Sequence, residues 1–198
     1  MSPVHKAIIT QQSIIDTWFT SLLSAQAPKG KKVPHAHRNP GGCIYALNMN
    51  KVNQSLQNLT ASETQKIQNS AFMISTLADK QSRKLRNEFY ISIIDRSIYT
   101  QINTRRWIPK RDINYWTTGT KTAPMLHTEV VSLFNRPVPP GDDIHHNNFF
   151  TFDNRDKNLV FLTASAHRQR HSGITMRNAV YITNDQGMID FIQNVVVK

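Results

Sequence analysis

The chain has 198 residues, and its 24 Lys and Arg against 13 Asp and Glu give a formal net charge of +11 at pH 7. This length allows one domain, or a small domain with an appendage, and the charge indicates a polyanionic partner, although ribosomal and membrane-surface proteins share that bias. Cys43 is the only cysteine, which excludes an internal disulfide and favours a reduced, cytoplasmic compartment.

The first apolar stretch, residues 7–27, is interrupted by Gln11, Gln12 and Asp16, so we expect neither a signal peptide nor a membrane span. Apolar residues recur in this stretch at helical spacing and predict a first amphipathic helix, which Pro28 and Gly30 end. The residues that carry this pattern are Ile14, Ile15, Trp18, Phe19, Leu22 and Leu23.

Residues 29–42 are basic and rich in helix breakers, which predicts an irregular loop. Lys31 and Lys32 are candidate contacts for DNA phosphates. His35 and His37 are better explained as solvated side chains than as metal ligands, because the sequence places no further ligand near them.

A second helix is predicted to begin at Thr60, which has the spacing of a capping box with Glu63. Its apolar positions are expected to continue through Ile67 and Ala71 as far as Ala78. Together the two helices predict that residues 1–88 form a mainly helical, basic N-terminal region, which is a candidate for DNA binding.

Residues 89–102 are rich in β-branched and aromatic side chains and predict one or two strands, with a turn near Asp95. Cations interleaved with aromatic residues follow. Trp107 and Trp116 are expected in a core, whereas the cations are candidate DNA contacts. These cations are Arg105, Arg106, Lys110 and Arg111.

Four histidines in residues 142–171 are the candidate metal ligands and the candidate general base. His145 and His146 are adjacent in a stretch whose alternation suits a strand, so they should lie on opposite faces and have different roles. His167 and His171 are four residues apart in a segment typical of a helix, so both project from one face at ligand distance for one ion. One strand histidine can complete that site, and the other, neutral near pH 7, is left to take a proton from water.

The apolar run at residues 158–162 is expected to pair with the first strand. Asn158 stands at its start, where a side-chain amide can bind loop backbone and hold the hairpin. Residues 180–183 and 188–192 predict either a closing hairpin or a strand and a short helix.

This segment resembles the HNH nuclease family, also called the ββα-metal or His-Me finger fold, and is most similar to phage and homing-type members. The similar elements cover residues 125–172, about a quarter of the chain. They are Leu126-His127, Pro140-Gly141, His145-His146, Asp153-Asn154-Arg155 and Asn158-Leu159. The resemblance implies an α+β fold with a ββα-metal core in a nuclease domain at residues 89–198, a helical N-terminal region and a small antiparallel sheet.

Roles follow from the resemblance residue by residue. His145 is similar to the family's first metal ligand, His146 to its general base, and His167 to its second ligand. His171 matches a further histidine of toxin-type members that contacts the metal or the scissile phosphate, and Asn158 matches the structural asparagine. A backbone carbonyl is expected to orient the base through its other ring nitrogen.

Arg155 and Arg168 flank the motif and are candidate DNA contacts, as is Arg170 unless it faces solvent. Many phage members have Asp and Asn where this chain has His145 and His167. Imidazole suits Zn²⁺, Ni²⁺, Co²⁺ or Mn²⁺ better than Mg²⁺, so one divalent ion is expected and its identity stays open. The single cysteine excludes the four-cysteine structural zinc of some members.

The resemblance implies a metal-dependent endonuclease that acts on double-stranded DNA and leaves 5′-phosphate and 3′-hydroxyl ends, of the homing, nicking or phage type. The alternatives are an HNH-type II restriction endonuclease acting as a dimer, a colicin-like toxin and a catalytically inactive DNA-binding module. The sequence leaves open the recognition site, nicking against double-strand cleavage, and monomer against homodimer.

Overall fold

The computed structural model describes residues 23–25, 43–47, 49–78, 85–105, 107–110, 115–118, 124–173, 181–182 and 185–197. Several predictions therefore lie outside the described residues. They are the first helix up to Leu22, the basic loop with Lys31, Lys32, His35 and His37, and the candidate contacts Arg106 and Arg111.

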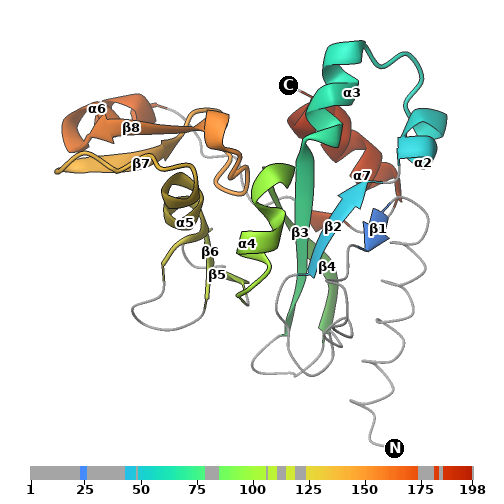
Figure 1. Cartoon of the computed structure of the whole chain (residues 1–198), viewed down its shortest axis with the longest axis horizontal. Helices are drawn as coiled ribbons and strands as arrows, with labels where there is room; N and C mark the ends of the chain where they lie inside the picture. Colours follow the sequence, from blue (N-terminus) through green and yellow to red (C-terminus); the bar gives the residue numbers. More distant parts are fainter. Residues whose placement is uncertain are drawn as a thin grey trace, which may run out of the picture.

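A five-stranded antiparallel sheet forms one half of the molecule, in the order β1-β2-β3-β4-β9. Its two long central strands, β3 and β4, stand side by side in Figure 1. The strands are β1 (Leu23–Ala25), β2 (Cys43–Leu47), β3 (Ser70–Ala78), β4 (Leu85–Asp95) and β9 (Tyr181–Ile182).

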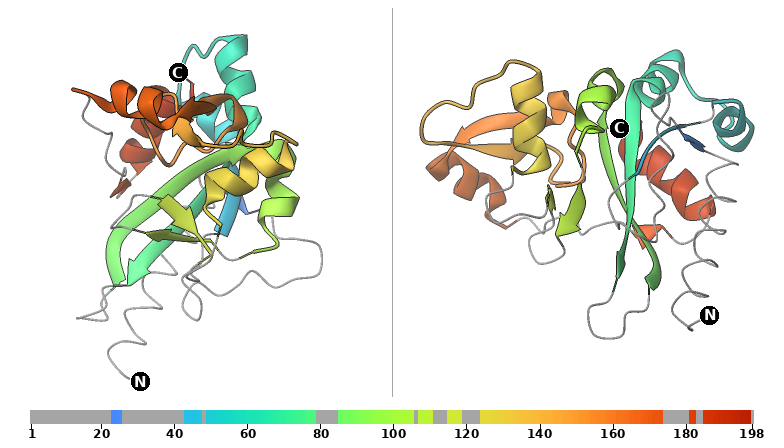
Figure 2. Two further views of the ribbon diagram at one scale, coloured as in Figure 1. Left: turned by 90° about the vertical axis from the view of Figure 1, so that its left-hand side faces the viewer. Right: turned by 60° about the horizontal axis from the view of Figure 1, so that its bottom comes forward.

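The helix before β3 and the C-terminal helix lie beside this sheet (Figures 1 and 2). The helix α3 (Ala61–Gln68) contacts β2 and β3, and the π-helical turn Ile192–Val196, which continues α7 (Asp185–Phe191), contacts α3. Phe191 meets Phe72 of β3 edge to face, with ring centroids 6.5 Å apart. A further short helix, α2 (Met49–Ser55), precedes α3.

The other half of the molecule carries two small antiparallel sheets (Figure 1). After β4 come a 3-10 turn (Arg96–Ile98) and α4 (Tyr99–Ile102), then β5 (Ile108–Lys110) paired with β6 (Tyr115–Thr117). The remaining elements are α5 (Leu126–Leu133), β7 (Asp142–His146), a 3-10 turn (Asp156–Asn158), β8 (Leu159–Thr163) and α6 (Ala164–His171).

The loop between β7 and β8 joins the two halves. Ile93 of β4 donates its N–H to the carbonyl of Phe152 at 2.8 Å, and its own carbonyl accepts from the N–H of Asn154 at 2.8 Å. Phe150 and Phe152 are both buried in the common core. The loop that follows the paired histidines is therefore fixed to the central strand of the large sheet.

The structure confirms the α+β class with small antiparallel sheets and corrects the second helix. The capping box of Thr60 and Glu63 is present, but the helix ends at Gln68 and residues 70–78 form β3. Ala71, Phe72 and Met73 are all buried, because a central strand is covered on both faces, and helical spacing does not distinguish such a run from a helix.

The expectation of a mainly helical region at residues 1–88 is therefore wrong for its described part, where strand residues outnumber helical ones. Leu23, predicted at the end of the first helix, lies in β1. The boundary predicted between residues 88 and 89 falls inside β4.

Later elements agree better with prediction. Within residues 89–102 the strand ends at Asp95, where the break was expected, but a helical segment rather than a second strand follows. Near the C-terminus, β9 and α7 confirm the strand followed by a short helix. Trp107 and Trp116 are core residues, each 1% exposed. The described helices are all too short or too polar to span a membrane.

Candidate functional site

The candidate site is built on β7, β8 and α6. The strands β7 and β8 pair so that His145 lies opposite Val160 and His146 opposite Leu159. The chain then turns directly into α6, whose N-cap residue Thr163 accepts a hydrogen bond from the Ala166 N–H at 3.3 Å. This short connection returns the helical histidines to the strand from which His145 projects.

Three predicted residues come together as a cluster. One ring nitrogen from each of His145, His167 and His171 lies within 4.8 Å of the others. The Nε2 atoms of His167 and His171 are 3.0 Å apart, close to the spacing of two nitrogens bound to one tetrahedral ion with bonds of about 2.0–2.1 Å. The arrangement brings together the strand ligand and the helical pair that the sequence pattern predicts.

His145 has the atom that fits a metal best. Its side chain is buried, and its Nε2 has no hydrogen-bond partner within the described residues. A buried polar atom without a partner costs free energy that a coordinated cation would recover. Burial, together with the neighbouring His171 and His167, lowers the pKa of His145 to about 4, so its ring is neutral at pH 7 and can bind a cation without first losing a proton.

Asp143 contacts a histidine of the cluster, and the sequence did not predict this contact. Its Oδ2 lies 3.0 Å from Nδ1 of His167, which leaves Nε2 of that ring on the side of His171. Histidines that bind metals commonly donate their other ring N–H to a carboxylate in this way. The available signal was position, because residues 143 and 145 lie on one face of a strand.

His146 lies on the opposite face and has a different environment. It is 3% exposed, and its ring lies near the rings of His127 and Tyr115, at centroid distances of 5.5 and 6.0 Å. Burial lowers the pKa of His146 to about 4, so the imidazole is neutral at pH 7. The neutral state expected for this histidine is thus a consequence of its burial.

The prediction that a backbone carbonyl orients His146 is wrong. Its Nε2 lies 3.2 Å from Oδ1 of Asn154, so a side-chain amide occupies the place expected for a carbonyl of the main chain. Asn154 belongs to the loop that is bound to β4, and its own N–H donates to Ile93. The orientation of His146 therefore depends on the large sheet.

His127 is a further site neighbour to which sequence reasoning gave no role. It stands in the first turn of α5, with ring contacts to Tyr115 and His146. Burial, with a smaller effect from the nearby His146, lowers the pKa of His127 to about 3. Two neutral imidazoles thus lie in ring contact with each other.

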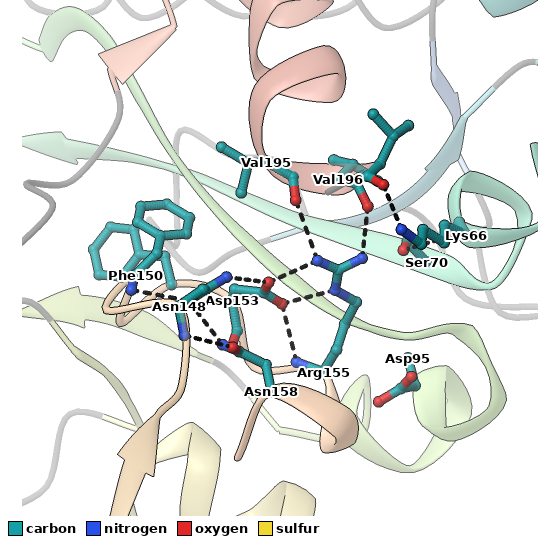
Figure 3. Close-up of polar contacts among 12 residues, drawn as sticks. Lys66, Ser70, Asp95, Asn148, Phe150, Asp153, Arg155, Asn158, Val195 and Val196 are labelled. Carbon is teal, nitrogen blue, oxygen red and sulfur yellow. Dashed lines mark hydrogen bonds and ion pairs between the residues drawn. The ribbon is translucent and has the colours of Figure 1, made fainter. Parts of the chain in front are cut away.

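Asn158 holds the loop between β7 and β8, as its position at the start of the second strand predicts. Its Nδ2 donates to the Asp153 carbonyl at 2.7 Å and to Oδ1 of Asn148 at 3.0 Å. Its Oδ1 accepts from the Asn148 N–H at 3.0 Å. Figure 3 shows these contacts beside the ion pair of Asp153.

Arg155 has internal partners for its guanidinium (Figure 3). Its Nε and Nη2 donate to the two carboxylate oxygens of Asp153 at 2.8 and 2.7 Å. Further bonds reach the carbonyls of Val196 at 2.8 Å and Val195 at 3.3 Å. The structure thus shows Arg155 tying the loop to the C-terminus, and a DNA contact by this residue stays a prediction.

The other candidate cations are spread over several elements. Arg168 and Arg170 are exposed on α6, and Nη1 of Arg170 donates to Oδ1 of Asn147 at 2.8 Å. Arg105 forms an exposed ion pair with Glu129 at 2.9 Å. Lys110 lies in β5. Of the candidate cations in the described residues, Arg168 and Arg170 thus share a helix with two histidines of the cluster.

No protein-family model, no curated protein and no solved structure matches this chain.

Proposed function

We propose that this chain is a metal-dependent DNA endonuclease of the HNH, or ββα-metal, class, which hydrolyses phosphodiester bonds to leave 5′-phosphate and 3′-hydroxyl ends. The observation that carries the proposal is the cluster of His145, His167 and His171, formed by a hairpin and the helix that follows it. A neutral, buried histidine, His146, directly follows the first member of the cluster.

In this proposal His145, His167 and His171 hold one divalent ion, and Asp143 orients His167. An ion held there would supply stabilisation of the negative charge that develops on the reacting phosphate. Three imidazole nitrogens form a donor set that suits Zn²⁺, Ni²⁺, Co²⁺ or Mn²⁺ better than Mg²⁺.

His146 accepts the proton of the attacking water. A general base must be unprotonated before the reaction, and burial keeps His146 in that state at neutral pH. Because His146 lies on the opposite face of β7 from the cluster, it stays separate from the ligand set.

The basic character of the chain supports a nucleic-acid substrate. The net charge of +11 favours binding to a polyanion, and Arg168 and Arg170 present cations on the same helix as two of the clustered histidines. A phosphate beside the cluster therefore has cations within one helix length of it.

The proposal is tested by cleavage of supercoiled plasmid in parallel reactions with EDTA, Mg²⁺, Mn²⁺, Co²⁺, Ni²⁺ and Zn²⁺. Wild type should nick or linearise the plasmid with at least one metal and not with EDTA. His146→Ala should cleave at least about 100-fold more slowly, because general-base catalysis contributes about 10²–10⁴-fold. Ser165→Ala, an exposed change on α6, is the matched control and should cleave as wild type does.

Cleavage that resists EDTA, or His146→Ala acting at the wild-type rate, would contradict the proposal. Salt-sensitive DNA binding without cleavage by any metal would favour the inactive DNA-binding module instead.

A further inference from the structure

A chain of buried hydrogen bonds runs from β4 to His146. Oγ of Ser92 lies 2.9 Å from the Phe152 carbonyl, Nδ2 of Asn154 lies 2.8 Å from that Oγ, and Oδ1 of Asn154 lies 3.2 Å from Nε2 of His146. Ser92, Asn154 and His146 are 0%, 1% and 3% exposed. With so little contact with water, the direction of each bond is set by the protein partners.

The hydrogen-bond directions follow from the Phe152 carbonyl, which can only accept a hydrogen bond. A carbonyl oxygen accepts and never donates, so Ser92 must give its single hydroxyl proton to Phe152. The Ser92 oxygen then has only lone pairs to offer, and the group facing it must be a donor. That group is the amide nitrogen of Asn154.

A second contact fixes the same orientation of the amide. Nδ2 of Asn154 also faces the carbonyl of Thr151 at 3.4 Å. Rotating the amide by half a turn would place Oδ1 against the oxygens of Ser92 and Thr151, neither of which has a proton to give. Oδ1 of Asn154 therefore faces His146 and acts as the acceptor.

The Asn154 amide oxygen then determines which ring nitrogen of His146 carries the hydrogen. Because Oδ1 of Asn154 accepts, Nε2 of His146 must donate. A neutral imidazole has a single N–H, so its Nδ1 is bare. The other tautomer would leave two lone pairs facing each other in a buried site.

We propose that Asn154 and Ser92 are positioning residues that hold His146 in its Nε2–H tautomer, with Nδ1 as the nitrogen that accepts a proton. The use of Nδ1 in water activation rests on the proposed function, whereas the tautomer does not. Ser92 belongs to β4, so the large sheet sets the protonation pattern of a side chain on the small hairpin.

The test is histidine NMR on the full, metal-free chain at about pH 8, where ¹⁵N and ¹³Cδ2 shifts distinguish the two neutral tautomers. The His146 signals are assigned by their loss in His146→Ala. Wild type is expected to show the Nε2–H form. An Nδ1–H form, or an equal mixture, would overturn the proposal without any variant.

Two variants at Asn154 separate positioning from packing. Asn154→Asp keeps an acceptor oxygen toward His146, so the Nε2–H form should persist. Asn154→Leu has similar size and no acceptor, so the Nε2–H preference should be lost. If both variants kept the wild-type tautomer, Asn154 would not be its cause.

Ser92→Ala gives a second measurement if Asn154→Leu fails to fold. It removes the acceptor that fixes the Asn154 amide, so a share of the Nδ1–H form should appear at His146. An unchanged tautomer in Ser92→Ala would contradict the role of Ser92.

Plasmid cleavage adds a functional comparison. Asn154→Leu should lower kcat by about 10- to 100-fold, the usual effect of losing a partner that orients a reacting or ligating group, and Asn154→Asp should retain most of it. If wild type showed the Nε2–H form of His146 but cleaved no plasmid with any metal, the proposed endonuclease activity would be refuted. The inference that Asn154 and Ser92 set the tautomer would still hold. Full kcat in a folded Asn154→Leu would overturn the part of the inference that concerns catalysis.

Discussion

At the scale of single residues, adjacent histidines have separate environments because successive side chains of a strand point to opposite faces. His145 faces His167 and His171, and its Nε2 has no hydrogen-bond partner in the described part of the chain. His146 faces Asn154 and the ring of His127. One strand therefore presents, on one side, the nitrogen that we propose binds a metal and, on the other, the ring that we propose accepts a proton.

The first residue-scale prediction concerns Asp143, whose carboxylate lies 3.0 Å from Nδ1 of His167. Asp143→Asn should weaken metal affinity by about 10- to 100-fold, because the ring loses the partner that fixes its tautomer and orientation. Isothermal titration of the full chain with Zn²⁺ measures this. Asp142→Asn, on the other face of the strand, is the control and should bind as wild type does. Equal affinities in the two variants would rule out an orienting role for Asp143.

His127 gives the second residue-scale prediction, on stability against pH. Its pKa is about 3 in the fold against 6.5 for the ordinary side chain, so below pH 6.5 the unfolded chain takes up a proton that the folded chain does not. The stabilisation is complete above pH 6.5 and is lost as the pH falls toward 3, at up to about 1.4 kcal/mol per pH unit.

From pH 7 to pH 5, linkage at His127 alone should remove about 2 kcal/mol from the free energy of unfolding. His127→Phe lacks the titrating group, so its loss over this range should be smaller by that amount. Denaturant unfolding at several pH values measures both. Parallel pH curves for wild type and His127→Phe would show that His127 titrates normally in the fold.

At the scale of secondary structure, the sequence predicts the small hairpin and its helix well because their signals are local. Alternation around His145 and the helical spacing of His167 and His171 each lie within a few residues, and both elements are present. The run at Ser70–Ala78 shows the opposite case, because only its neighbours β2 and β4 make it a central strand. Local pattern alone does not contain that pairing.

Contacts between distant parts of the chain also explain which site residues the sequence did not predict. Ser92 and Asn154 are 62 residues apart, and their contact depends on the loop lying along β4. No spacing rule joins two such positions. Asp143 was closer to prediction, since it shares a strand face with His145, but an acidic residue at a strand end is common on exposed surfaces.

The element-scale prediction concerns Arg155, which connects the loop between β7 and β8 to the C-terminal segment. Arg155→Met should destabilise the fold by about 3–5 kcal/mol, because it leaves the Asp153 carboxylate, which is 0% exposed, without its cation. Denaturant unfolding measures the change. Arg168→Met, at an exposed position of α6, is the control and should leave stability nearly unchanged. If Arg155→Met kept wild-type stability but lost DNA affinity, Arg155 would act at the DNA surface instead.

At the scale of the whole molecule, the site depends on both halves. Ser92, Ile93 and Asp95 of β4 all bind the loop between β7 and β8, the last through the Asp156 N–H at 2.6 Å. The C-terminal segment binds the same loop through Arg155. The domain boundary predicted at residue 88 would cut β4 itself and separate its second half from β3, the main partner of β4.

Dependence of the proposed reaction on the histidine cluster is measured by the rate of plasmid cleavage by the full chain as a function of Mn²⁺ concentration, for wild type and His167→Ala. Wild type should show a rate that saturates with metal, and His167→Ala should need far more Mn²⁺ and reach a lower maximum, because one of three imidazole ligands is gone. Identical metal dependence and identical rates for the two proteins would contradict the account, since the histidine cluster would then have no part in the reaction.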